Sequence, residues 1–289
     1  PLLALLAAIF NCGTLLTAQL KNIPGQYLVI GSRLLVLLTV SPIVFFMPWP
    51  EDIRFYLAVG LTGVIAGFAD TKVMNIARQY GGGVVSRILP FQIFIIFIMW
   101  LAIRPTQIAD YLATPMTSLG ILAALTGCVY FSANMRHCAV SGNALKSLML
   151  PMLGYAANYV LAKYAFEISD FHSGVYYYIL VQTAVLLPVM LLSGMGTGKS
   201  LVKLDKEMLF NRQTVVAAAF FYLFWMLHII AKNYANTLTP NPAYVAALAL
   251  TAPVWMIIIY KIMGHKEKAD VRSGIGLMIC AILLSLLNA

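Results

Sequence analysis

Apolar segments of membrane-spanning length follow one another along the whole chain. A helix that crosses the hydrocarbon core of a bilayer needs roughly 20 mostly apolar residues, and Gly, Pro or Asn residues separate runs of about that length. Lipid offers the backbone no hydrogen bonds, so such runs must be helices that satisfy their own amides. The sequence predicts ten membrane-spanning helices, at residues 2–20, 27–48, 55–77, 84–103, 115–133, 144–165, 173–194, 213–235, 242–263 and 271–288.

The composition agrees with a chain that lies mostly in lipid. Charged residues make up 10% of its 289 residues and hydrophobic ones 61%, whereas a soluble domain carries about 25% charged residues. The formal net charge is +9, but most cations lie between the apolar runs, where anionic lipid headgroups attract them. We therefore expect membrane lipids as partners and no nucleic acid.

The sequence also lacks the common patterns of enzymes and of resident cofactors. Residues 194–200 contain Gly-Lys-Ser, but without the spacing of a phosphate-binding loop. The four cysteines form no CxxC pair, and the four histidines lie on different predicted elements. We therefore expect no enzymatic activity, no cofactor and no metal.

The chain repeats itself across its midpoint. Residues 76–80 and 230–234 both run aliphatic, Ala, cation, amide, Tyr, and they lie 154 residues apart (230 minus 76). Each closes an apolar run, and a run with a proline follows, Pro90 or Pro253. Five spans in each half would place the second half upside down relative to the first. This pattern predicts two inverted repeats, residues 1–133 and 134–289, around a central cavity.

These motifs resemble the drug/metabolite transporter superfamily, in its ten-span branch of EamA-like carriers. The third and eighth runs end in Ala-cation-x-Tyr, similar to that family's Ala-Leu-Lys-Tyr. The fourth and ninth runs carry Leu-Pro-Phe at 89–91 and Ala-Pro-Val at 252–254, and the fifth and tenth carry glycine-spaced runs at 120–127 and 274–281. The resemblance implies a carrier of small metabolites, whose substrates range in this superfamily from amino acids to nucleotide sugars.

Four ionisable residues inside predicted spans are the first candidates for a substrate site: Arg33, Asp70, Lys72 and Arg87. A charge at the centre of a membrane costs at least about 2.5 kcal/mol, although the three cations lie near helix ends and could reach the headgroups. The side chain of Asp70 is too short for that. Asp70 and Lys72 lie about 200° apart around a helix, so they cannot face one partner. An ion pair of Asp70 with Arg33 or Arg87 is the structural alternative.

Three cations against one carboxylate would make this end of a cavity positive. We therefore expect a substrate with a carboxylate or another anionic group. Arginine binds carboxylate and phosphate through two hydrogen bonds at once, and Arg87 precedes Pro90, which can free a backbone carbonyl in the preceding turn. The sequence favours Arg87 as the clamp for this anion.

Polar and aromatic residues elsewhere complete the predicted site: Asn11, Thr14, Tyr155, Asn158, Trp225, His228 and Tyr244. For each of them a structural role stays open. Tyr and Trp are typical of interface belts, an amide can be satisfied between helices, and Asn11 and Thr14 could serve small-residue helix packing together with Gly13.

The sequence thus predicts an all-α integral membrane protein of an inner or plasma membrane, with ten transmembrane helices in two inverted five-helix repeats. Its predicted function is secondary transport of a small polar metabolite, an amino acid or an organic anion, by alternating access. Without an ATP site, the energy would come from a coupling ion or from a substrate gradient. One alternative is an exporter of cationic drugs or polyamines centred on Asp70, and another is a membrane-embedded enzyme or lipid-handling protein.

The orientation in the membrane stays open. Most Lys and Arg residues of the connections follow odd-numbered predicted helices, when Lys232 is counted with the connection after the eighth helix. By the positive-inside rule these connections lie in the cytoplasm, which places both termini outside. The resemblance to ten-span carriers implies the opposite, because both termini of those carriers usually lie in the cytoplasm.

Overall fold

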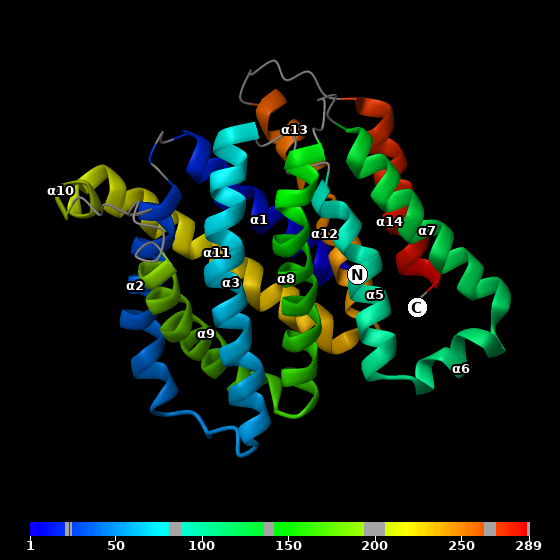
Figure 1. Cartoon of the computed structure of the whole chain (residues 1–289), viewed down its shortest axis with the longest axis horizontal. Coiled ribbons are helices and arrows are strands. Elements are labelled where there is room, and N and C mark those ends of the chain that lie inside the picture. Colours follow the sequence, from blue (N-terminus) through cyan, green and yellow to red (C-terminus); the bar gives the residue numbers. More distant parts are fainter. Residues whose placement is uncertain are drawn as a thin grey trace.

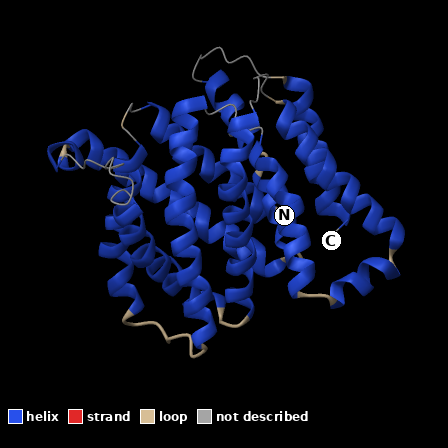
Figure 2. Ribbon diagram, in the orientation of Figure 1, coloured by secondary structure: helices blue, strands red, loops and turns tan. Residues whose placement is uncertain are grey.

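The computed structural model of the chain describes residues 1–20, 23, 25–80, 88–135, 142–193, 206–262 and 270–287. Throughout these residues the secondary structure is helical, and no strand is present in them (Figure 2). In chain order the elements are α1 (Leu2–Leu20), α2 (Gly25–Val44), α3 (Ile53–Tyr80), the 3-10 turn η1 (Leu89–Phe91), α5 (Gln92–Ile103), α6 (Thr106–Ala113), α7 (Pro115–Asn134), α8 (Gly142–Glu167), α9 (Phe171–Ser193), α10 (Lys206–Phe210), α11 (Arg212–Leu238), α12 (Pro242–Ala249), α13 (Ala252–Ile262) and α14 (Val271–Leu287).

By length and composition, the described residues contain six helical segments able to cross a membrane. They are Gly25–Val44, Ile53–Asp70, Pro115–Asn134, Phe171–Leu192, Arg212–Leu238 and Pro242–Ile259. The segment Leu89–Ile103 with Thr106–Ala113, bent by 112° between its two parts, would be a seventh. Residues Leu2–Thr14 and Val271–Leu287 form shorter apolar helices. The protein is therefore an all-α, multi-pass membrane protein.

Every one of the ten predicted segments contains helix, but two of them are interrupted. The segment 84–103 consists, where it is described, of η1 and α5, and Pro90 lies within η1. The segment 242–263 breaks between α12 and α13, because Pro253 has no N–H to donate in the first turn of α13. At this break the Thr251 hydroxyl donates to the carbonyl of Leu248 at 2.7 Å. The short helix α6 lies in a stretch predicted as a connection.

The most extensive helix contacts join segments far apart in the chain. Helix α1 packs on α11, α3 on α8 and α9, α2 on α11 and α9, and α7 on α14. Helix α5 packs on α8, and α1 also contacts α12 and α13. In Figure 1, α3 and α8 run side by side at the centre, while α7 and α14 lie together at one edge.

Small residues allow some of these helices to approach closely. On the α7–α14 contact, a Cβ added to Gly127 would overlap the thiol of Cys280, and one added to Gly276 would come within 2.6 Å of the Phe131 ring. The glycine-spaced runs at 120–127 and 274–281 therefore meet at one end, where Gly127 contacts Cys280. Since lipid gives helices no hydrophobic drive to associate, such van der Waals packing carries much of their association.

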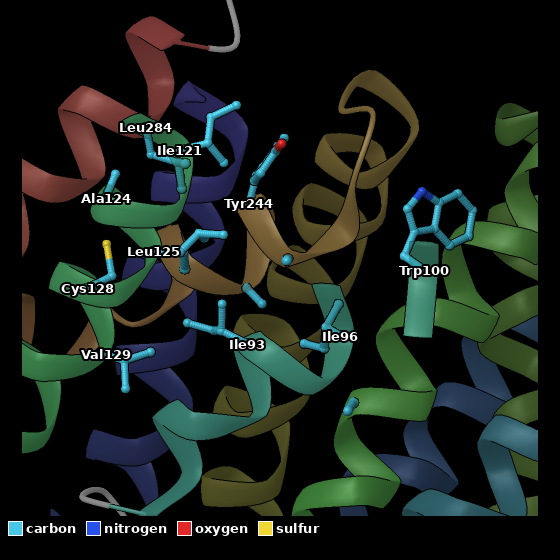
Figure 3. Close-up of a cluster of buried hydrophobic side chains, with 14 of the residues drawn as sticks. Ile93, Ile96, Trp100, Ile121, Ala124, Leu125, Cys128, Val129, Tyr244 and Leu284 are labelled. Carbon is cyan, nitrogen blue, oxygen red and sulfur yellow. The ribbon is translucent and has the colours of Figure 1, made fainter. Parts of the chain in front are cut away.

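The largest buried apolar cluster lies where α5, α7, α8, α12 and α14 meet (Figure 3). Its members include Ile93, Ile96, Trp100, Leu125 and Tyr244. A second cluster joins α2, α3, α8 and α9. These two clusters hold together several of the helices that surround the site described next, among them α2, α3, α8 and α9.

Candidate functional site

A cavity of about 480 Å³ lies among α1, α2, α3, α8, α9 and α11, beside η1 and the start of α5. This volume is within the range of small-molecule sites, about 300–1,000 Å³. Three basic side chains and one acidic side chain line it: Arg33, His228, Lys232 and Asp70. Amides and aromatic rings form most of the remaining polar wall.

Arg33 on α2 is held in the cavity by an aromatic ring. Its side chain lies against Trp225 of α11, with the guanidinium carbon 3.5 Å from the ring centroid, and the residue is only 6% exposed. Its Nε and Nη1 atoms are buried and have no hydrogen-bond partner among the described residues. The stacked ring fixes the cation but leaves these donors free. An acceptor brought into the cavity would satisfy them.

Asp70 on α3 is paired with a hydroxyl rather than with a cation. Tyr155 of α8 donates to its Oδ1 at 2.7 Å, and within the described residues Asp70 forms no ion pair. The two helices approach closely at Gly154, where an added Cβ would lie 2.9 Å from Cγ2 of Ile65. The small residue next to Tyr155 thus lets its hydroxyl reach the carboxylate. The ion pair of Asp70 with Arg33, which the sequence left open as a structural alternative, does not form, and Arg87 lies outside the described residues.

His228 and Lys232 lie one turn apart on α11, so both face the cavity. His228 Nδ1 is 2.8 Å from the carbonyl oxygen of Ala7 on α1. Because a carbonyl only accepts, Nδ1 carries a hydrogen, and in the neutral ring Nε2 is left as an acceptor. Lys232 is 8% exposed, and its Nζ lies 4.9 Å from the centroid of the Tyr159 ring.

Of the eleven residues predicted for the site, eight line this cavity: Asn11, Thr14, Arg33, Asp70, Tyr155, Asn158, Trp225 and His228. Lys72 does not. It is exposed on the other side of α3, beside Leu150 and Pro151 of α8, as its angle of about 200° from Asp70 requires. Tyr244 also lies elsewhere, because α12 directs its hydroxyl to that of Tyr111, 2.5 Å away.

Five cavity residues that matter chemically were not predicted: Gln92, Tyr159, Tyr178, Gln182 and Lys232. Lys232 was counted with the connections, but α11 continues six residues beyond it to Leu238. The spacing of four from His228 could have identified it. Buried amide oxygens of Gln92, Asn158 and Gln182 have no hydrogen-bond partner among the described residues.

A set of polar contacts, here named the α5–α8 latch, lies beyond one end of the cavity. It comprises Trp100, Arg104, Lys163, Glu167 and Pro240. Trp100 Nε1 donates to the Pro240 carbonyl at 2.8 Å, Arg104 pairs with Glu167 at 2.5 Å, and Lys163 Nζ lies 3.5 Å from Glu167. The hydrogen bond to Glu167 raises the pKa of the Arg104 guanidinium.

The latch and the cavity share two helices. Leu89 and Gln92, at the start of the η1–α5 segment, line the cavity, and Trp100 and Arg104 lie at its end. On α8, Lys163 follows the cavity residue Tyr159 by one turn. The latch therefore joins the ends of α5 and α8, two helices that also line the cavity.

The described residues contain no group of three or more His, Cys, Asp or Glu side chains that could hold a metal ion. Comparisons of the chain with protein-family models and with curated proteins gave no match.

Proposed function

We propose that this protein is a secondary transporter that moves a small polar metabolite, an amino acid or an organic anion, across its membrane by alternating access. The observation that carries the proposal is the cavity of about 480 Å³, which holds a buried Arg33 with unused hydrogen-bond donors inside a multi-pass membrane protein. Ionisable residues are costly in a membrane and typically mark a substrate or ion pathway.

The helix packing supports a chain of two related five-helix halves. In that arrangement α1 corresponds to α8, α2 to α9, α3 to α11, α5 with η1 to α12 with α13, and α7 to α14. Exchanging each helix for its counterpart turns the α1–α11 contact into the α8–α3 contact, α2–α11 into α9–α3, and α5–α8 into α12–α1. All of these contacts are present, and α2–α9 and α7–α14 map onto themselves.

Two such halves in opposite orientation can rock about a site between them. The cavity fits that position, because α1, α2 and α3 line it from one proposed half and α8, α9 and α11 from the other. The resemblance of the sequence motifs to EamA-like carriers points the same way.

The charges in the cavity favour an anionic group on the substrate. Arg33 and Lys232 are cations, Asp70 is the opposing carboxylate, and neutral His228 adds an acceptor. The sum is one positive charge. Arg33 suits the role of clamp, since a carboxylate could accept from the donors that the protein leaves free. An exporter of cations centred on Asp70 is less well supported, because two cations share the cavity with that carboxylate.

A thermal-shift screen of the purified protein tests this proposal. The panel would hold pyruvate, glutamate, succinate, phosphoenolpyruvate and spermidine, each measured on wild type, Arg33→Gln and the control Arg212→Gln, whose arginine is exposed. A hydrogen bond to a charged group contributes about 1.5–3 kcal/mol, so Arg33→Gln should weaken binding of the stabilising acid about 10- to 150-fold.

The control should bind like wild type. Stabilisation by spermidine that Asp70→Asn abolishes would reverse the proposed substrate class. No stabilisation by any member of the panel, together with no uptake of any into vesicles, would contradict the transport proposal.

A further inference from the structure

We infer that the cavity binds a proton together with the substrate anion, with Asp70 as the proton-binding group, so that the carrier is an anion–proton symporter. This inference rests on the proposed function and adds the coupling ion to it. The proton converts the Asp70 carboxylate to a carboxylic acid, with no other bond made or broken.

Asp70 shares the cavity with titratable side chains from four other helices. Within the described residues these groups are Arg33 of α2, Tyr155 and Tyr159 of α8, Tyr178 of α9, and His228 and Lys232 of α11. Of them, only Tyr155 bonds to the carboxylate. Lys72, two residues further along α3, is exposed on the opposite side of the helix.

The charge balance of the cavity links the proton to the anion. With Asp70 ionised and His228 neutral, two cations face one carboxylate, and the net charge is one positive. An incoming anion is attracted by Arg33 and Lys232 but repelled by Asp70. Protonation of Asp70 removes that repulsion and raises the net positive charge to two, which suits a doubly charged anion or binds a singly charged one more tightly.

The size of the cavity sets the scale of this effect. A sphere of 480 Å³ is about 10 Å across. Two like charges about 10 Å apart, at an effective dielectric constant of about 20, repel each other enough to weaken binding about 15-fold. Binding linkage is reciprocal. The anion should therefore increase the proton affinity of Asp70 by the same factor.

The Asp70–Tyr155 hydrogen bond connects this proton to the movement of the carrier. Asp70 belongs to the first proposed half and Tyr155 to the second, and their helices form one of the most extensive contacts in the protein. A change in the charge of Asp70 alters a hydrogen bond that rocking of the halves must break. The bound proton and the conformational step thus act on the same contact.

Proteoliposomes with a pH-sensitive dye inside test the inference. Pyruvate, glutamate, succinate and phosphoenolpyruvate would be added outside one at a time, at external pH values between about 5.5 and 7.5, while uptake and internal pH are recorded. Wild type should acidify the lumen during uptake, and uptake should rise as the external pH falls. In Asp70→Asn, which keeps an acceptor for Tyr155, uptake should occur without acidification and without pH dependence.

Asp110→Asn is the matched control, since Asp110 is an exposed carboxylate on α6; it should behave as wild type does. Infrared spectra of the protein without substrate add an independent measurement. A protonated-carboxyl band that grows with acidification should be present in wild type and reduced in Asp70→Asn.

The outcomes separate the two proposals. Uptake without acidification, or with the same pH profile in wild type and Asp70→Asn, would overturn proton coupling and leave the transporter in place. Infrared spectra that are identical in wild type and Asp70→Asn would do the same. Failure of wild type to take up any of the four acids at any pH would overturn the transport proposal itself, and the symport with it.

Discussion

Replacing Glu167 by Gln is expected to loosen the α5–α8 latch without changing the cavity. Glu167 accepts from Arg104 at 2.5 Å and lies 3.5 Å from Lys163 Nζ. The substitution keeps the size of the side chain and removes its charge. The contacts that hold the end of α5 to α8 then lose their shared anion.

The expected cost follows from how exposed the partners are. The Arg104 side chain is 49% exposed, so its pair contributes about 0–1 kcal/mol. The Lys163 side chain is only 5% exposed, and removing the partner of a fully buried ion costs about 3–5 kcal/mol. Here the cost is smaller, because Glu167 is 25% exposed and Lys163 also donates to the Asn236 carbonyl at 3.0 Å. We expect the latch to open more easily by about 1–3 kcal/mol in total.

Hydrogen exchange measured by mass spectrometry reports this opening. In Glu167→Gln, peptides that cover residues 100–107 and 236–244 should exchange about 5- to 150-fold faster, while peptides of α7 and α14 should not change. Glu51→Gln, at an exposed site, is the control and should match wild type. Equal exchange in wild type and Glu167→Gln across both segments would refute the claim that these ion pairs hold this end closed.

Three further predictions concern packing, the cavity wall and a helix start. Gly127→Ala places a Cβ against the Cys280 thiol of α14 and should lower stability by about 1–3 kcal/mol. Gly60→Ala, where an added Cβ meets nothing within 4 Å, should raise stability by about 0.5–1 kcal/mol. Thermal unfolding that finds Gly127→Ala as stable as Gly60→Ala, or more stable, would contradict this. Trp225→Ala removes the ring stacked on Arg33 and should weaken anion binding about 2- to 30-fold, while Trp225→Phe should recover most of it; calorimetric titration that finds the two variants equal would refute the role of stacking. Asp170→Ala should cost about 0.5–2 kcal/mol at pH 7, because an N–H in the first turn of α9 donates to this carboxylate and lowers its pKa. That contribution is present above about pH 4 and is lost as the pH falls through the lowered pKa, so the melting temperatures of variant and wild type should converge in acid.

The helices could be predicted from the sequence because lipid imposes one rule on every span. A run of apolar residues must be helical, and the ten predicted segments all contain helix in the described residues. What the rule does not predict is where a helix is interrupted. The break before Pro253 depends on a proline in the middle of a long apolar run, and α6 is an eight-residue helix too short to give an apolar period. Whether all ten segments cross the membrane stays a prediction.

The site was predicted less completely, and for a physical reason. In a soluble helix the polar face shows which side meets water, but a membrane helix is apolar almost all round, so periodicity does not show which side meets a cavity. Rarity of charge identified Arg33 and Asp70. It also selected Lys72, which faces outward from α3, and it missed Lys232, which was counted with the connecting residues although the predicted span 213–235 contains it.

The contacts that fix the cavity's polar groups mostly connect the two proposed halves, and this connects the site to its mechanism. Tyr155 bonds to Asp70 between α8 and α3, Trp225 stacks on Arg33 between α11 and α2, and His228 contacts a carbonyl of α1. None of these is an ion pair, so each can be exchanged for a contact with a ligand without leaving an ion pair broken. The α5–α8 latch, in contrast, contains ion pairs and lies outside the cavity. In the proposed transport cycle, a bound anion would compete for Arg33 and so act on the contacts between the proposed halves at the site, whereas the ion pairs of the latch would oppose separation of α5 from α8.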